Sequence, residues 1–305
     1  MQNTLLSVKT SFLWSRDKFL AFQKEDGLFF PFFRIAIGLF CCTHLLAISR
    51  DFELLYTDSG LIPLKILSIQ KVQYMPSYSY VQSILTYLGI TSSSFALGYM
   101  ILYGILCITL VFGFLTRFSS LTLLFLHILI FQSSTPYMYG VEFFKSIALF
   151  YCFIFPVGNK ISVDSLIFKR SEINPTPYRN LLKIHMSIVY FTSGIDKSFG
   201  INWWNGESVW KAIHLPGFKS NIIDNYNLFA QYPSLPLLFG IGTIIIEVFY
   251  PLAMAFRKTR MLWLLLTISL HVGIILSLNL YFFGLLMILL NLAAFLTLKD
   301  DKHDV

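Results

Sequence analysis

The sequence predicts an all-α integral membrane protein, a bundle of about eight transmembrane helices. Hydrophobic residues make up 56% of its 305 residues and charged residues only 13%, about half the share found in soluble domains. The 31 Phe and 16 Tyr fit a protein whose aromatic rings lie at membrane interfaces. The net charge of +7 is scattered over the loops between apolar runs. We therefore attribute it to membrane topology and expect no nucleic-acid partner.

Eight apolar segments have about the length that a membrane crossing needs, roughly 17 to 25 residues. Their predicted ranges are 28–48, 95–114, 118–135, 142–157, 179–195, 235–256, 261–277 and 281–298. The last two form an almost continuous run that is too long for one crossing, so we expect a break at 277–281 (SLNLY). No second soluble domain is visible, which predicts a single membrane domain over residues 1–305.

Lysine and arginine set the predicted topology, because they gather in the cytoplasmic loops of membrane proteins. With the N-terminus inside, the inner segments carry most of the basic residues that lie outside the spans, including Arg117, Arg257 and Lys258. Both termini are then cytoplasmic, in a bacterial inner membrane.

This topology leaves two long loops on the outer side, 49–94 and 196–234. Each contains a segment that we expect to form an interfacial helix, YMPSYSYVQSILTYL (74–88) and ESVWKAIH (207–214). The first 22 residues mix aromatic and basic side chains and are expected to lie on the membrane surface.

Ionisable side chains inside spans cost free energy and usually face the interior of the bundle. Glu142 and Lys145 lie three positions apart on one helix face, where they can neutralise each other. They form either a structural ion pair or the support of a site. Glu247 lies deep in the sixth span, where a partner such as Arg34 is expected, although the sequence does not establish the pairing.

The spans also carry histidines, namely His44, His127, His185 and His271. Their spacing includes no HxxxH or HxxH, so we expect no metal site. A lone histidine on an apolar helix more often bonds to a neighbouring helix. We assign this supporting role to His127 and His271.

Lys197 follows an apolar run in VYFTSGIDKSFGINWWNGESVW (189–210) and has two interpretations. Desolvation near the membrane favours the neutral amine, which can act as a base, while Asp196 opposes this if it faces the same side. Alternatively, Lys197 is an interfacial lysine flanked by Trp203 and Trp204. The residues alone leave both interpretations open.

Several motifs resemble the HTTM (horizontally transferred transmembrane domain) family. SGIDKSFGINWWNG resembles its lysine motif, K-x5-W-x2-G, which is matched by Lys197, Trp203 and Gly206. Further similar segments follow the family's order: FFRIAIGLF with LLYTDSGLIP, SSTPYMYGVEFFK with FIFPVGNKISVDSL, and IIIEVFYPLAMAF with HVGIILSLNLYFFGLLMILL. The resemblance extends along nearly the whole chain.

The family includes the membrane part of vitamin K-dependent gamma-glutamyl carboxylase and small SdpB-like bacterial proteins that mature a secreted peptide toxin. In the carboxylase, the motif lysine deprotonates a reduced quinone on the lumenal side. The resemblance therefore implies that Lys197 is a catalytic base facing outward, with a vitamin K-type reduced quinone as cofactor. It also implies a pocket shaped by Trp203 and Gly206.

The central motif adds further expected pocket residues. Tyr139 would lie near the mouth of the pocket, and Glu142 with Lys145 would support the helix that lines it. Thr135 occupies the position where the carboxylase has a catalytic histidine. Because of this replacement, and because the resemblance covers only the membrane part, a full carboxylase is not expected.

Three hypotheses follow. The first is an enzyme, or an enzyme subunit, that modifies or matures a peptide at the outer membrane rim with a lysine base and a lipid-soluble quinol. The second is a non-catalytic SdpB-like partner in peptide toxin maturation, export or immunity. The third is a transporter. The expected partners are membrane lipid, a secreted or membrane-associated peptide and, as an open alternative, a further protein subunit.

Overall fold

The computed structural model describes residues 26–57, 60–62, 66, 74–133, 138–168, 172–218, 220, 222 and 225–296. Over these residues the chain is helical and contains no strand. It divides into two compact units, treated separately below: unit 1 comprises residues 1–29 and 174–305, and unit 2 comprises residues 30–173. The predicted surface helix at the N-terminus lies outside the described residues. The expectation of one membrane domain over residues 1–305 stays a prediction.

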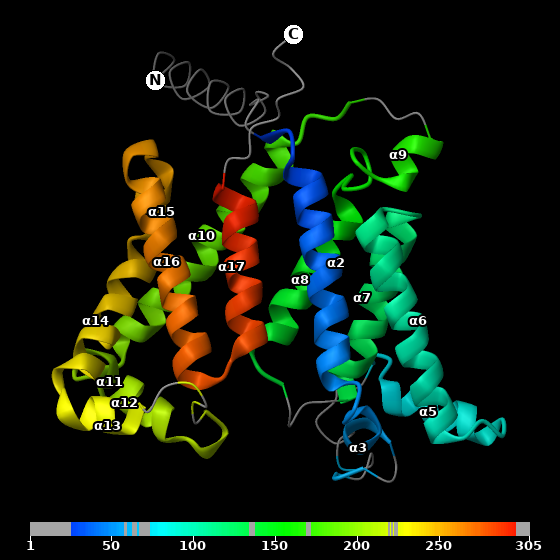
Figure 1. The fold of residues 1–305 in the computed structure, drawn as a ribbon, viewed down its shortest axis with the longest axis horizontal. Helices are drawn as coiled ribbons and strands as arrows, with labels where there is room; N and C mark the ends of the chain where they lie inside the picture. Colours follow the sequence, from blue (N-terminus) through cyan, green and yellow to red (C-terminus); the bar gives the residue numbers. More distant parts are fainter. Residues whose placement is uncertain are drawn as a thin grey trace, which may run out of the picture. The chain divides into compact units, whose positions relative to one another are not determined.

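Unit 2 contains seven of the described helices, the first of which begins one residue before it. They are α2 (Phe29–Ile48), α3 (Phe52–Tyr56), α5 (Tyr78–Tyr87), α6 (Ser92–Phe112), α7 (Thr116–Ser133), α8 (Gly140–Ile154) and α9 (Val163–Ile167). α7 packs against α6 and α8, and the short α5 packs against α6 and α7 (Figure 1). Polar caps set the helix starts, since Ser77 and Thr91 each accept a backbone N–H from the first turn of α5 and α6.

Aromatic rings hold the short helices of unit 2 against α6. Phe52 of α3 and Tyr78 of α5 are fully buried, and both rings contact Tyr99 of α6, at centroid distances of 5.5 and 5.3 Å. Burial raises the pKa of Tyr78, and the charge of Glu53 adds to this effect, so its phenol stays neutral. Within the aromatic segment expected at 74–88, the residues Tyr78–Tyr87 therefore form a helix, and the first ring of this helix lies inside the unit.

Unit 1 contains the remaining described helices. They are α10 (Thr176–Phe199), α11 (Ile201–Trp204), α12 (Glu207–His214), η3 (Pro216–Phe218), α13 (Asn225–Gln231), α14 (Ser234–Val248), α15 (Tyr250–Ala255), α16 (Arg257–Leu278) and α17 (Tyr281–Phe295). α10 packs against α14, α15 and α17, and α16 packs against α15 and α17 (Figure 1). The predicted helix ESVWKAIH coincides with α12.

The expected break at 277–281 is confirmed. α16 ends at Leu278 and α17 begins at Tyr281, and Asn279 between them has a φ of 55°. Asparagine is among the few non-glycine residues that adopt this left-handed conformation readily, so it can reverse the chain between two apolar helices.

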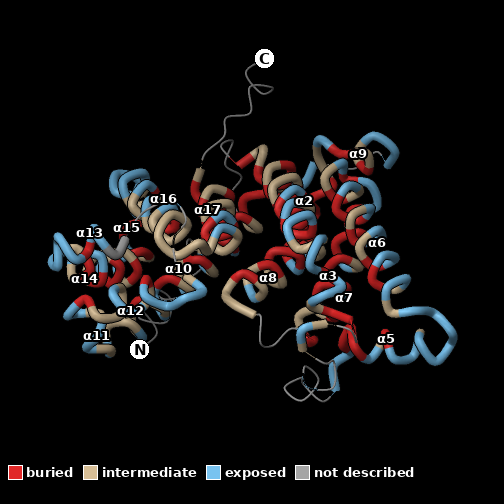
Figure 2. The backbone as a smooth tube through the Cα atoms, turned by 60° about the horizontal axis from the view of Figure 1, so that its bottom comes forward, coloured by how far each residue is buried: buried red, intermediate tan, exposed pale blue. Residues whose placement is uncertain are grey.

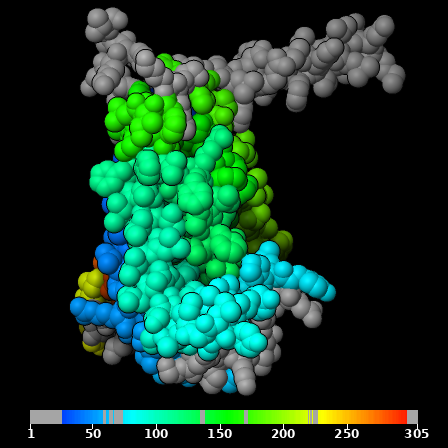
Figure 3. All heavy atoms as spheres, turned by 90° about the vertical axis from the view of Figure 1, so that its right-hand side faces the viewer, coloured from blue at the N-terminus to red at the C-terminus, as the bar shows by residue number. Residues whose placement is uncertain are grey.

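Each of the eight predicted spans coincides with a helix, except that α14 and α15 share the sixth. In the described part of the chain, α2, α6 and α16 are long and apolar enough to cross a membrane, and α14 and α17 are shorter apolar helices. Exposed positions alternate with buried ones along α6 and α16 (Figure 2), and the exposed ones include Ile101, Ile105, Leu262 and Leu265. Figure 3 views unit 2 from the side on which α6 lies, with α5 projecting at its lower end. Apolar surface of this extent indicates contact with lipid.

A buried ion pair ties the two ends of unit 1 together. The Arg179 guanidinium, near the start of α10, lies 2.5 Å from the Oδ1 atom of Asp26. The same guanidinium donates to the carbonyl oxygens of Ala293, at 3.0 Å, and Leu296, at the end of α17. Both charged side chains are almost completely buried.

Replacing Arg179 with Met should strongly destabilise the protein, by about 3–5 kcal/mol, because the Asp26 carboxylate is left buried without its cation. Arg179→Met combined with Asp26→Asn removes both charges and should recover a large part of the loss. Unfolding of the purified protein in detergent, followed by circular dichroism, measures both. Equal losses in the single and double variants would contradict the pairing.

Candidate functional site

Lys197 lies in the last turn of α10, where the helix dipole favours a cation. Its Nζ atom donates to the Oε2 atom of Glu247 at 2.7 Å and to the Oγ atom of Ser193 at 2.5 Å. Ser193 precedes Lys197 by one helical turn, and Glu247 comes from α14. The side chain of Lys197 is 20% exposed and that of Glu247 is 9% exposed. The lysine thus belongs to a largely buried ion pair.

An aromatic ring completes the surroundings of the amine. The Nζ atom lies 5.3 Å from the centre of the Trp203 ring, within the range of a cation–π interaction. The amine is therefore contacted by a carboxylate oxygen, a hydroxyl oxygen and a ring face. Any role of Lys197 as a base requires that its proton can pass to one of these neighbours.

Glu247, not Asp196, determines the charge environment of Lys197. Asp196 is exposed, on a different side of α10 from its neighbour. Thirteen positions separate Ser234, at the start of α14, from Glu247, which is about 20 Å along a helix. Because Lys197 contacts Glu247, the amine lies near the C-terminal end of α14, far from Ser234.

Three glycines make this approach possible. A Cβ atom on Gly194 of α10 would lie 2.7 Å from the backbone nitrogen of Val248, and one on Gly240 of α14 would lie 2.4 Å from the carbonyl oxygen of Trp203. Gly206 has a φ of 81°, and its Cβ would lie 2.5 Å from the backbone nitrogen of Leu237. The last glycine of the K-x5-W-x2-G pattern therefore lets the turn before α12 contact the backbone of α14.

The expected pairing of Arg34 with Glu247 is wrong. Arg34 belongs to unit 2, is 1% exposed, and donates to the carbonyl oxygens of Val157 at 3.3 Å and Ile161 at 2.6 Å. It secures the segment after α8, whereas Glu247 pairs with Lys197. The sequence contains no signal that ranks these alternatives, because both cations are distant from Glu247 along the chain.

A second ionic cluster lies in unit 2. Glu142 and Lys145 form the expected ion pair across one turn of α8, with Nζ 3.2 Å from Oε2. The same Nζ atom lies 3.0 Å from Nδ1 of His44 on α2, and Nε2 of His127 on α7 lies 3.0 Å from the backbone oxygen of Glu142. Lys145 is 4% exposed. His44 was missed as a member of this cluster, since only the packing of α2 against α8 places it there.

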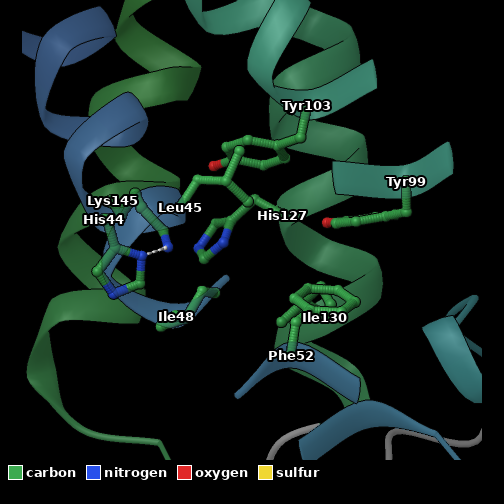
Figure 4. A pocket seen from close by; sticks show the side chains of 9 residues that line it. All are labelled: His44, Leu45, Ile48, Phe52, Tyr99, Tyr103, His127, Ile130 and Lys145. Carbon is green, nitrogen blue, oxygen red and sulfur yellow. Dashed lines mark hydrogen bonds between the residues drawn. The ribbon is translucent and has the colours of Figure 1, made fainter. Parts of the chain in front are cut away.

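This cluster borders a small cavity (Figure 4). The cavity has a volume of about 20 Å³, enough for one water-sized molecule. Lys145, His44 and His127 form its polar side, and Phe52 and Ile130 lie opposite. The remaining lining residues are Leu45, Ile48, Tyr99 and Tyr103.

The other expected pocket residues are placed as follows. Tyr139 precedes α8 in unit 2, and burial, with a smaller contribution from Glu142, raises the pKa of its phenol to about 12. Thr135 lies outside the described residues. Tyr139, Glu142 and Lys145 therefore belong to unit 2, whereas Lys197, Trp203 and Gly206 belong to unit 1.

Both histidines expected to give polar support bond to another helix. His127 does so through its contact with Glu142, and Nε2 of His271 on α16 lies 2.6 Å from the hydroxyl of Tyr190 on α10. Over the described part of the chain, no group of three or more His, Cys, Asp or Glu side chains is arranged to hold a metal ion.

These features define a class: a helical integral membrane protein with two buried Lys–Glu pairs, one of them carried by the lysine motif. The HTTM domain model matches residues 22–298, so the chain belongs to the HTTM family. The match includes every helix described above. Searches of curated proteins and of solved structures give no significant match.

Replacing Gly240 with Ala should disturb the lysine motif, because the new methyl group meets the Trp203 carbonyl oxygen at 2.4 Å. Overpacking of this kind costs about 1–3 kcal/mol. Gly242→Ala, in the same helix with no atom within 4 Å of its Cβ, is the matched control and should be neutral or slightly stabilising. Unfolding midpoints in detergent compare the two, and equal midpoints would contradict the close contact.

Replacing Lys145 with Met should destabilise unit 2 by about 3 kcal/mol or more, since Glu142 is left largely buried without its cation. Adding Glu142→Gln should recover much of this loss. Lys211→Met, which breaks a solvent-exposed pair with Glu207, should leave the unfolding free energy nearly unchanged. The pairing is refuted if Lys145→Met behaves like Lys211→Met.

Proposed function

We propose that this protein modifies or matures a peptide at the outer membrane rim, with Lys197 as a base and a lipid-soluble quinol as cosubstrate. In this proposal eight helices cross a bacterial inner membrane, both termini are cytoplasmic, and the site faces outward. The observation that carries the proposal is the Lys197–Glu247 pair, held by the residues of the family's lysine motif.

The pair can deliver a neutral amine without a net change in charge. Transfer of one proton from Nζ of Lys197 to Oε2 of Glu247, over the observed 2.7 Å, converts two buried ions into two neutral groups. Charged groups are disfavoured in an apolar interior, so the cost of this transfer is smaller here than in water. The neutral amine can then accept a proton from a substrate hydroxyl, while Glu247 keeps the first proton.

The residues around Lys197 suit a neutral, flat, hydroxyl-bearing ligand. The Lys197–Glu247 pair is neutral overall and attracts no net charge, and the Trp203 ring offers an aromatic face beside the amine. When bound, a quinol would supply an acidic hydroxyl and reducing equivalents. The chain's own part is to position that hydroxyl and to hold its proton at Nζ.

The second candidate is a non-catalytic partner in peptide maturation, export or immunity. The same contacts of Lys197 favour it if they serve only to stabilise the fold. An ion pair, a hydroxyl and a cation–π contact already account for Lys197 as a structural residue. In that case the charge of Lys197 matters and its ability to lose a proton does not.

Two variants separate these functions. Lys197→Ala and Lys197→Arg should each reduce maturation by about 100-fold or more, the size of a lost general base. Arginine keeps the positive charge beside Glu247 but cannot become neutral at ordinary pH. The assay is mass spectrometry of the peptides that the cells secrete, with membrane levels of the protein matched between the strains.

Lys211→Ala serves as the control, because Lys211 forms a solvent-exposed pair with Glu207. It should leave maturation unchanged. If Lys197→Arg restores maturation while Lys197→Ala does not, charge alone is required and the non-catalytic function replaces the proposed one.

A further inference from the structure

The turn between α15 and α16 in unit 1 leaves two cations exposed. α15 ends at Ala255 and α16 begins at Arg257, so Phe256 alone separates the two helices. Arg257 and Lys258 are the first residues of α16, and both are exposed. No described Asp or Glu follows Glu247 in the chain, and neither cation forms an ion pair within the described residues.

The next two polar side chains of α16 hold the turn itself. Oγ1 of Thr259 donates to the carbonyl oxygen of Ala253 at 2.6 Å, and Nε of Arg260 donates to the carbonyl oxygen of Met254 at 3.1 Å. These bonds satisfy carbonyl groups at the end of α15, which lack partners within their own helix. The turn is therefore fixed without the two exposed cations.

The helix does not stabilise these two charges either. The first turn of a helix carries the positive end of its dipole, which disfavours cations. α16 has no acidic residue in this turn and no side-chain cap that would compensate. The favourable interactions of Arg257 and Lys258 therefore lie outside the helix.

Apolar surface begins next to the two cations. Met261, Leu262 and Leu265 on α16 are each more than half exposed, and so are Leu252 of α15 and Phe256 of the turn. Of the three helices long and apolar enough to cross a membrane, α16 is the least buried. A surface suited to hydrocarbon thus starts within one helical turn of the exposed charges.

This combination of charge and apolar surface fits an anionic phospholipid. A phosphate group accepts charge-assisted hydrogen bonds from guanidinium and ammonium groups, and the long side chains of both residues can bend towards it. We infer that Arg257 and Lys258 bind the headgroup of an anionic phospholipid, whose acyl chains lie along the exposed side of α16. The inference is independent of the chemistry proposed for Lys197.

Other occupants use only part of this surface. A free phosphate ion has no acyl chains to cover the apolar side of α16, and a zwitterionic phospholipid carries no net charge to match the two cations. In the predicted topology the turn is cytoplasmic, so the lipid belongs to the inner leaflet, where anionic headgroups attract basic segments next to a span.

The test uses Trp263 as a reporter, because it lies six positions after Arg257, about 9 Å along α16, beside the expected acyl chains. The full-length protein is reconstituted in phosphatidylcholine bilayers that contain a small share of phosphatidylglycerol with brominated chains, which quench tryptophan. Trp263→Phe gives the signal of the other tryptophans, which is subtracted. Brominated phosphatidylglycerol should quench Trp263 more strongly than the same share of brominated phosphatidylcholine.

Arg257→Gln combined with Lys258→Gln removes both charges and leaves the apolar surface intact. A basic side chain near a membrane surface contributes about a fivefold preference for anionic lipid, so this variant should lose about 25-fold of the preference. Arg50→Gln combined with Lys211→Gln is the matched control, since it removes two exposed cations from other loops. It should keep the wild-type preference.

Two measurements on the wild type need no variant at the lipid site. High salt should lower the preference, because it screens exposed charges. Inorganic phosphate at millimolar concentration should not displace the brominated phosphatidylglycerol. The inference is overturned if both brominated lipids quench Trp263 equally, if the Arg257→Gln and Lys258→Gln variant keeps the wild-type preference, or if phosphate competes, which would assign the cations to a free anion.

Discussion

The pairing of buried charges is the constraint on which unit 1 depends. A lysine and a glutamate inside an apolar helix bundle are tolerated only when each satisfies the other, and here 2.7 Å separates Nζ of Lys197 from the Glu247 carboxylate. That distance requires α10 and α14 to approach closely, which the absence of a side chain at Gly194 permits. The motif therefore combines a charge that needs a partner with backbone that lets the partner approach.

The two Lys–Glu pairs solve the same electrostatic problem with different surroundings. Lys145 is nearly inaccessible, and its second acceptor is a histidine nitrogen from another helix. Lys197 is one-fifth exposed and has an aromatic face and a hydroxyl beside it. Only the second arrangement combines access with a neighbour that can store a proton. The chemical argument accordingly rests on Lys197, although both lysines are buried enough to require a counter-ion.

Helix positions could be predicted from the sequence because they depend on local properties. Long apolar runs mark helices such as α2, and Asn279 marks the reversal between α16 and α17. The Glu142–Lys145 pair was also accessible, because its members share one helical turn. These features need no knowledge of which helices meet.

The pairings between helices could not be predicted in the same way. Glu247 has several candidate cations in a membrane protein, and Arg34 was the wrong one because carbonyl oxygens at the turn after α8 satisfy it instead. Ser193, one turn from Lys197, was available from spacing but has no meaning until Glu247 is placed. Tyr190 and Asn291 are single polar residues in apolar helices, and only their contact reveals a network.

The polar groups that contact α10 are charged near its C-terminal end and neutral farther from that end. At one end, a proton shared by Lys197 and Glu247 can move without changing the total charge. Farther along, Tyr250, Asn291 and Tyr190 are joined to one another and to His271 by neutral hydrogen bonds. The two sets of contacts make different demands on α10. The ion pair fixes the helix against α14, whereas the neutral network, with its tyrosine, asparagine and histidine, fixes it against α15, α16 and α17. The end of α10 that carries Lys197 is therefore held by charge, and the stretch before it is held by directed neutral hydrogen bonds.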